Sequence, residues 1–242
     1  MDKDAIYRLM DKLGESQSKE LHKTLLQTVV AQGEAVLPLI LEYAILPPSQ
    51  LKSVPVLEVI NEFGYPANRH SLQYVASVIS DPNDMGWELA FKVAKTIGPP
   101  IIPAIRAAIK YYMTDLDFNN LCIQGLCQYL EEIDPGQTSE ALPELIELLS
   151  NGTDENYIVD YAILPIKRIG SPIADRAIPI IFSIIVSPNR SIRVKRLSIK
   201  ALMEFDKEKV RFQTSLLEDR LLNNEPEIID DIHKLFTWLK QK

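Results

Sequence analysis

The stretch Ala177-Ile178-Pro179-Ile180-Ile181-Phe182 contains the pattern that decides the fold: a small or apolar pair, a proline, and apolar residues after it. The same pattern recurs in three further places: Ala35–Leu41, Ile101–Ile105 and Ala141–Ile146. Two weaker copies lie around Gln73 and near Thr214. The equivalent positions 38, 73, 103, 143 and 179 are 35, 30, 40 and 36 residues apart. A period near 35 residues is typical of proteins built from stacked helical repeats.

Helix-breaking residues precede most copies of the pattern. A segment of helical periodicity ends there in Gly or Asp together with proline: Gly64-Tyr65-Pro66, Gly98-Pro99-Pro100, Asp134-Pro135-Gly136 and Gly170-Ser171-Pro172. Glycine adopts the left-handed conformation that ends helices, and proline is tolerated in the first turn of the next helix. Most of the 16 prolines are therefore expected to separate helices instead of disrupting them.

The periodicity predicts an all-α chain without strands. The predicted helices are 3–13, 18–32, 34–45, 50–63, 68–80, 85–97, 100–113, 118–132, 138–150, 154–169, 173–186, 190–204, 207–223 and 225–241. Each pair is amphipathic and needs a neighbour to bury its apolar face. We therefore expect residues 1–242 to form one domain, with cap helices in 1–17 and 225–242.

These repeats resemble HEAT repeats, in particular the short form found in bacterial and phycobilisome-lyase-like proteins. The period, the Ala-Leu/Ile-Pro start of the second helix and the paired helices carry the resemblance from about residue 18 to residue 242. Asp81-Pro82-Asn83-Asp84 and Ser187–Arg193 also fit the family's Asp and Arg pattern, whereas the other repeats fit it poorly. The resemblance implies a right-handed α-α superhelix, or α-solenoid, of about six helix pairs. Such solenoids serve as scaffolds, inhibitors, lyase partners and, rarely, enzymes.

Composition excludes disorder and a membrane span. The 242 residues are 46% hydrophobic and 24% charged, and no uncharged run reaches the roughly 20 residues that a membrane helix needs. The start Met1-Asp2-Lys3-Asp4 lacks the apolar core of a signal peptide. The two cysteines, Cys122 and Cys127, suit a reducing compartment and are expected in the core. We expect a cytoplasmic protein that does not contact membranes.

Charge is distributed unevenly along the chain. The 56 residues 111–166 contain no Lys, Arg or His and 11 acidic residues, whereas residues 167–211 carry a net charge of +7. The total of −7 hides this separation. An exposed helix normally carries Lys among its Glu, so a long window without a base favours contact with a basic partner.

The acidic window supplies the candidate binding residues. Glu140, Glu144 and Glu147 have the i, i+4, i+7 spacing of one helix face, and the resemblance places that face in the concave surface of a solenoid. Tyr111, Asp154 and Tyr157 are further candidate contacts, because tyrosine is favoured at interfaces. The sequence predicts a protein–protein interaction module with a basic partner, for example an immunity or inhibitor protein that blocks a basic nuclease or toxin. The alternative is a solvated helix face, and for Tyr157 and Tyr161 a pair in the core.

The helix predicted at 190–204 has a basic stripe of Arg193, Arg196 and Lys200. This stripe either contacts phosphate or nucleic acid, or balances the acidic repeat within the molecule. The overall charge of −7 argues against nucleic-acid binding.

Catalytic and metal-binding motifs are not found in the sequence. The histidines His22, His70 and His233 are far apart, and neither phosphate-binding nor nucleophile motifs occur. We expect no cofactor, no metal and no enzymatic activity. A lyase-like or glycosylase-like solenoid enzyme, or a subunit of one, remains an alternative.

Overall fold

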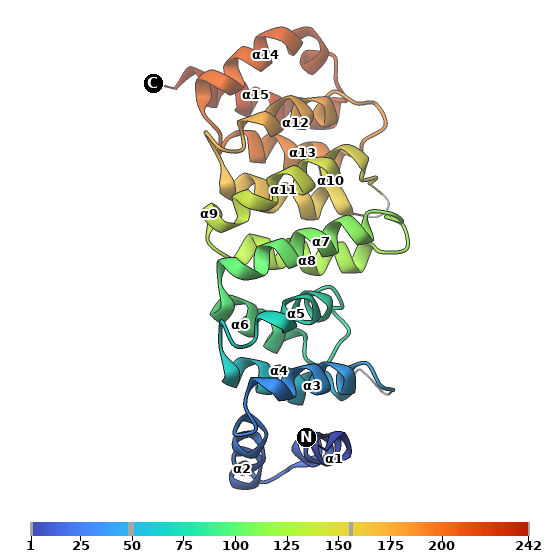
Figure 1. The fold of residues 1–242 in the computed structure, drawn as a ribbon. Helices are drawn as coiled ribbons and strands as arrows, with labels where there is room; N and C mark the ends of the chain where they lie inside the picture. Colours follow the sequence, from blue (N-terminus) through green and yellow to red (C-terminus); the bar gives the residue numbers. More distant parts are fainter. Residues whose placement is uncertain (1, 48–50, 155–156, 242) are drawn as a thin grey trace. The chain divides into compact units, whose positions relative to one another are not determined.

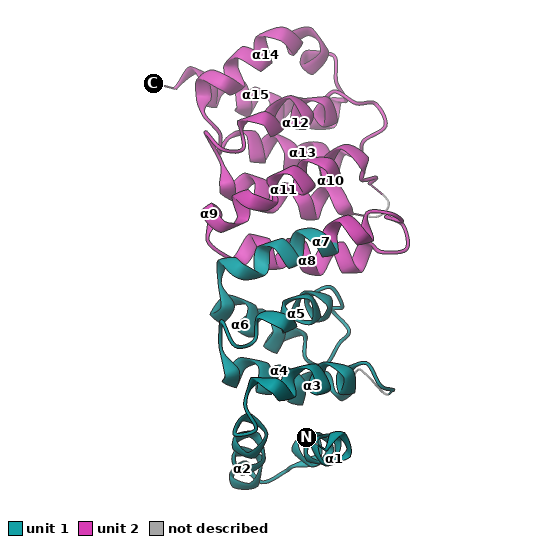
Figure 2. Ribbon diagram, viewed as in Figure 1, with its two compact units in different colours: residues 1–108 teal, residues 109–242 magenta. Residues whose placement is uncertain are grey.

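All regular secondary structure in the part of the chain that the structure describes is helical. The structure, a computed structural model, describes residues 2–47, 51–154 and 157–241, which contain helices, turns and loops without strands (Figure 1). The predicted all-α class is confirmed. Two compact units, Met1–Ala108 and Ile109–Lys242, divide the chain within α7, and each is described by itself (Figure 2).

Unit 1 consists of helices arranged in two rows. Short 3₁₀ turns precede several of them, and the elements are α1 (Lys3–Glu15), α2 (Lys19–Val30), η1 (Glu34–Val36), α3 (Leu37–Ala44), α4 (Ser53–Phe63), η3 (Arg69–Ser71), α5 (Leu72–Ile79), α6 (Trp87–Ile97), η4 (Pro99–Ile101) and the start of α7 (Ile102–Tyr112). Helix α4 packs against α2 and α6 in one row, whereas α1 and α3 pack together in the other. The pairs α1–α2, α3–α4 and α5–α6 join the rows.

Unit 2 has the same arrangement. Its elements after α7 are α8 (Asn120–Glu132), α9 (Pro135–Thr138), η5 (Ser139–Ala141), α10 (Leu142–Asn151), α11 (Ile158–Ile169), η6 (Asp175–Ala177), α12 (Ile178–Ile185), α13 (Ile192–Leu202), α14 (Lys207–Leu222) and α15 (Pro226–Lys240). Contacts run through α8, α11, α13 and α15 in one row and through α10, α12 and α14 in the other. Apolar side chains between the rows form the core, and Ile163, Ile181 and Phe182 are fully buried there.

The residues between the helices behave as the sequence predicts. Gly64, Gly98 and Gly170 end α4, α6 and α11 with φ angles of 65°, 72° and 61°, a conformation that costs other residues energy. Pro38, Pro143 and Pro179 occupy the first turn of α3, α10 and α12, where a missing N–H breaks no helical hydrogen bond.

Five predicted helices are divided in the described part of the structure: 34–45, 68–80, 100–113, 138–150 and 173–186 each begin with a 3₁₀ turn before the α-helix, and 138–150 differs most. The prediction of 138–150 is replaced by α9, the 3₁₀ turn η5 and α10. The Asp134 side chain accepts hydrogen bonds from the N–H groups of Gly136 and Gln137 and so starts α9 separately. Glu140 consequently lies in η5, outside α10.

A search of the described residues for membrane spans gives no single helix of sufficient length and apolarity. The bent pair formed by 19–30 and 34–44 passes the same test by length and composition only.

Candidate partner-binding surface

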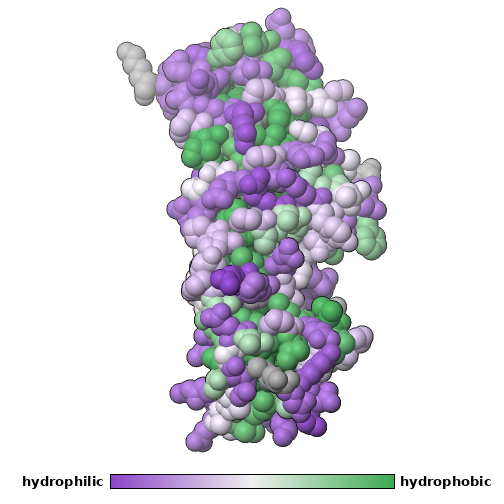
Figure 3. Space-filling view, in the orientation of Figure 1, coloured by the Kyte–Doolittle hydropathy of each residue, from purple (hydrophilic) through white to green (hydrophobic). Residues whose placement is uncertain are grey.

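Two glutamates of the acidic window lie at the surface of unit 2. Glu140 and Glu147 are exposed, and neither makes an ion pair with any described residue. Hydrophilic side chains cover much of the face of unit 2 shown in Figure 3, with apolar atoms visible between the helices. These carboxylates are thus available to a partner.

Glu144 lies in a different environment from the one that the helix-face argument predicts. Its side chain is 1% exposed, and Oε1 lies 3.2 Å from Nζ of Lys110 on α7. The prediction of an exposed stripe through Glu140, Glu144 and Glu147 is therefore wrong at its centre. Glu144 lies in the first turn of α10, on the side that faces Lys110 of α7.

Asp154 is held by residues beyond the acidic window. Its Oδ1 accepts a 3.1 Å hydrogen bond from the Arg190 guanidinium, and its Oδ2 accepts one from the Ser191 backbone N–H. Burial raises the pKa of Asp154, but the hydrogen bonds from Ser191 and Arg190 outweigh burial and place the pKa below its ordinary value. The carboxylate predicted as a partner contact thus joins the loop before α11 to the start of α13.

Tyr157 has an unusual backbone conformation at the start of α11. Its φ angle is 59°, in the left-handed region that non-glycine residues rarely adopt. The Arg193 guanidinium lies 4.5 Å from the ring centre, so one face of this half-exposed ring is already occupied. The predicted core pair of Tyr157 and Tyr161 on one helix does not form, because Tyr157 precedes α11.

Asp160 completes this cluster through an ion pair with Arg193. Its other oxygen, Oδ2, is buried and accepts no hydrogen bond from the described residues. Burial therefore outweighs the attraction of Arg193 and raises the pKa of Asp160 above its ordinary value. Two carboxylates in the same cluster thus have pKa values displaced in opposite directions.

Tyr111 matches its predicted position at the surface. It lies near the end of α7 and is 71% exposed, and its ring meets that of Tyr112 edge-on at 5.2 Å. The ring is accessible to a partner.

The predicted basic patch is largely used within the molecule. Arg193 pairs with Asp160, and Arg196 donates to Oδ2 of Asp231 at 2.9 Å and to the Glu227 carbonyl. Lys200 is exposed and makes no ion pair with the described carboxylates. The observed pairs agree with the alternative in which the basic helix balances acidic residues internally.

Lys195 is a buried cation that the sequence argument did not single out. Its side chain is 1% exposed and donates to Glu225 Oε2 at 2.7 Å and to Asn224 Oδ1 at 3.1 Å. These bonds attach α13 to the start of α15. A lysine at a position where the helical pattern calls for an apolar residue was the available sequence signal.

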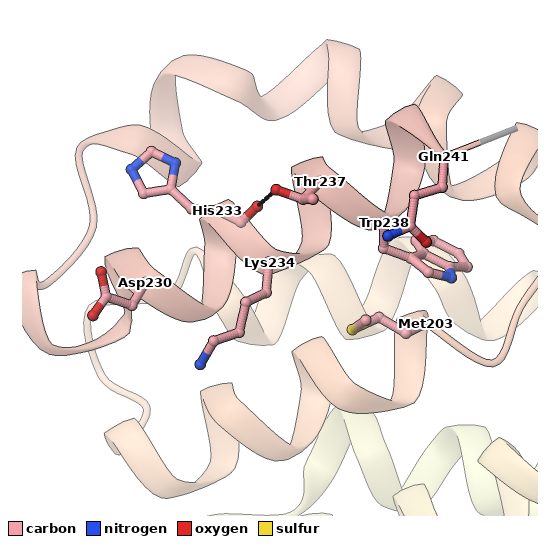
Figure 4. Close-up of a pocket in the computed structure, with 7 residues that line it drawn as sticks. All are labelled: Met203, Asp230, His233, Lys234, Thr237, Trp238 and Gln241. Carbon is pink, nitrogen blue, oxygen red and sulfur yellow. Dashed lines mark hydrogen bonds between the residues drawn. The ribbon is translucent and has the colours of Figure 1, made fainter.

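A pocket of about 370 Å³ lies beside α15 in unit 2 (Figure 4). Its lining residues are Met203, Asp230, His233, Lys234, Thr237, Trp238 and Gln241. The labelled side chains include both charges, the imidazole of His233 and the indole of Trp238, and the figure shows the Thr237 hydroxyl bonded to the His233 carbonyl. We see no arrangement of a nucleophile and a base in it.

The surroundings of Cys127 and His22 favour a structural role for both side chains. Burial raises the pKa of the Cys127 thiol to about 12, which makes it a poor nucleophile. His22 lies 3.0 Å from the Glu58 carboxylate. Among the described residues, no group of three or more His, Cys, Asp or Glu side chains could hold a metal ion.

Comparisons with protein-family models, with curated proteins and with solved structures return no match for this chain. The functional argument therefore depends on the geometry of its own residues.

Proposed function

We propose that the chain is a HEAT-like α-solenoid, a right-handed superhelix of about six helix pairs, that binds a basic protein partner without catalysing a reaction. The fold part of this proposal is supported by the spacing of ion pairs within each unit. Many join residues between 30 and 39 positions apart, about one repeat: Lys3–Glu42, His22–Glu58, Lys110–Glu144, Asp154–Arg190, Asp160–Arg193, Lys167–Glu204, Lys195–Glu225 and Arg196–Asp231. Contacts of this spacing are expected where each repeat touches the next.

The observation that carries the binding proposal is the exposure of Glu140 and Glu147 without ion-pair partners among the described residues. The window 111–166 supplies no base to neutralise them, and the nearby cation Lys110 pairs with Glu144. The binding surface consists of Glu140, Glu147 and Tyr111, whereas Glu144, Asp154 and Tyr157 support it from within. An inhibitor or immunity protein that covers a basic nuclease or toxin is the concrete form of this function.

Electrostatic attraction of this kind acts chiefly on association and is weakened by salt. The Debye length is about 8 Å at physiological ionic strength, so the carboxylates attract only charges that approach closely. A complex formed through this surface should therefore dissociate at high salt.

Charge reversal tests the proposal. Glu140→Lys/Glu147→Lys changes the formal charge from −7 to −7 + 4 = −3. The control Glu62→Lys/Glu218→Lys makes the same change at exposed glutamates elsewhere. In pull-downs from the source organism, we expect the first variant to lose the basic proteins that the wild type and the control retain at low salt. Identical sets of captured proteins for both variants would contradict the proposal.

A further inference from the structure

The loop between α7 and α8, together with the helix ends that it joins, exposes three large apolar side chains, which we call the apolar cluster. Phe118 is 85% exposed, Tyr111 71% and Leu121 50%. A hydrogen bond of 3.1 Å from the Asn119 side chain to the Tyr112 carbonyl closes the loop and brings its two ends together. Tyr111 and Phe118, each next to one of these residues, thus lie at the same end of the helix pair.

Hydrogen bonds within the loop hold this conformation. The Asp115 carboxylate accepts a 3.1 Å bond from the Phe118 N–H, and the Asn119 N–H donates to the Asp115 carbonyl at 3.0 Å. The Thr114 hydroxyl donates to the Tyr111 carbonyl at 2.8 Å. Phe118 is therefore presented to solvent by an ordered turn, which lowers the entropy lost when a partner binds.

Unpaired carboxylates accompany the apolar cluster. Asp115 is exposed and makes no ion pair with the described residues. Glu147 lies three residues beyond Glu144 on α10, about one helical turn, and Glu144 contacts Lys110, the residue before Tyr111. The carboxylates of Asp115 and Glu147 thus favour a partner that brings positive charge to the apolar cluster.

We propose that Tyr111, Phe118 and Leu121 dock one large apolar side chain of a basic peptide segment, whose Lys or Arg residues face Asp115 and Glu147. This inference rests on the proposed function and deepens it, because it names the kind of segment that the acidic surface receives. A second copy of the chain fits less well, since two such loops would bring like charges together.

Titration of the full-length, ¹⁵N-labelled chain with synthetic peptides tests this inference by NMR. One peptide has a tryptophan flanked on both sides by lysines; in two control peptides, glycine replaces the tryptophan or glutamates replace the lysines. We expect the first peptide to shift the amide signals of residues 111–121 and to bind about tenfold more tightly than the glycine peptide, since a large apolar side chain is buried. The glutamate peptide should not bind.

Phe118→Ser should weaken binding of the tryptophan peptide about tenfold, whereas Phe212→Ser should leave it unchanged. Phe212 is a suitable control because it is 67% exposed on α14, and neither substitution removes a buried side chain. Equal affinities of the wild type and Phe118→Ser, or shifts confined to other residues, would overturn the inference.

The two proposals can fail separately. If Glu140→Lys/Glu147→Lys weakens binding and Phe118→Ser does not, the docking site is overturned and the acidic surface stands. If the glutamate peptide binds as well as the lysine peptide, both are overturned. A change from dimer to monomer on Phe118→Ser in analytical ultracentrifugation would assign the apolar cluster to a second copy of the chain and overturn the peptide site.

Discussion

Glu144 and Glu147 are separated by one turn of α10 but differ in their surroundings. Glu147 faces solvent, whereas Glu144 is buried against α7 with Lys110 as its partner. The helical period places both on one side of the helix, yet a helix in a row has neighbours on its flanks as well as opposite it. The sequence predicts the angular separation of two side chains around the helix axis, but not which of the two side chains contacts the neighbouring helix.

Glu144→Lys should lower the free energy of unfolding by about 2 kcal/mol or more, because it places a second cation beside Lys110 in a buried position. The cost is smaller than for a fully buried pair, since the Lys110 side chain is 63% exposed. Glu147→Lys should change the free energy by less than about 0.5 kcal/mol, as expected for a surface site. Urea unfolding measures both, and equal values would show that Glu144 is not buried.

Asp154 and Asp160 should affect stability with opposite dependence on pH. The pKa of Asp154 is lowered on folding, so its stabilisation is present above its unfolded pKa and is lost as the pH falls through the folded pKa. The pKa of Asp160 is raised, so ionisation above that pKa opposes folding.

Asn substitutions separate these two effects. Asp154→Asn should cost about 1–3 kcal/mol at neutral pH and less in acid, because its charged hydrogen bonds are lost only where the carboxylate is ionised. Asp160→Asn should become more favourable, relative to the wild type, from acid to neutral pH. Urea unfolding across this range measures both trends, and parallel trends would contradict the assigned pKa directions.

The sequence predicts the positions of the helices better than it predicts the contacts between them. Pro143 and Pro179 mark helix starts and Gly98 marks a helix end, because their effects on the backbone are local, although Pro165 lies inside α11. The sequence does not predict the separate helix α9, because Asp134 before Pro135 is typical of a helix stop as well as of an N-cap. The exposed Phe118 was not singled out either, since an apolar residue next to polar Asn119 and Asn120 gives no periodic signal.

Gly98→Ala should destabilise the chain by about 1 kcal/mol, because its φ of 72° is strained for any residue with a side chain. No atom within 4 Å would meet the added Cβ, so this cost is conformational and not steric. Gly14→Ala is the matched control. Gly14 lies in α1, where an added Cβ would meet Pro55 Cγ at an ordinary 3.5 Å, and alanine there should stabilise by about 0.5–1 kcal/mol. Thermal unfolding should show shifts in opposite directions.

At the scale of the whole molecule, the repeat-length spacing of contacts predicts that destabilisation stays local. Ile181→Ala removes a fully buried side chain from α12 and should cost about 2–5 kcal/mol. Hydrogen exchange should accelerate in α10, α13 and α14, which contact α12 directly or flank it in its row, and remain unchanged in α2 and α4. Equal acceleration throughout the chain would show one cooperative unit instead of successive repeats.

The separation of acidic and basic residues along the chain can be interpreted only from the packing of the helices. The sequence shows an acidic window beside a basic one, but only the packing shows that Arg190 and Arg193 neutralise Asp154 and Asp160. Glu140 and Glu147 are among the carboxylates that make no ion pair with the described residues, and they belong to the surface that we propose binds a basic protein.

The central claim is that these remaining carboxylates bind a basic protein. Its most direct test is the affinity of the captured partner for the wild type, Glu140→Lys/Glu147→Lys and Glu62→Lys/Glu218→Lys at low and high salt. We predict tight, salt-sensitive binding by the wild type and the Glu62/Glu218 control, and weak binding by the Glu140/Glu147 variant at either salt concentration. An affinity that is independent of salt and equal for all three proteins would contradict the claim.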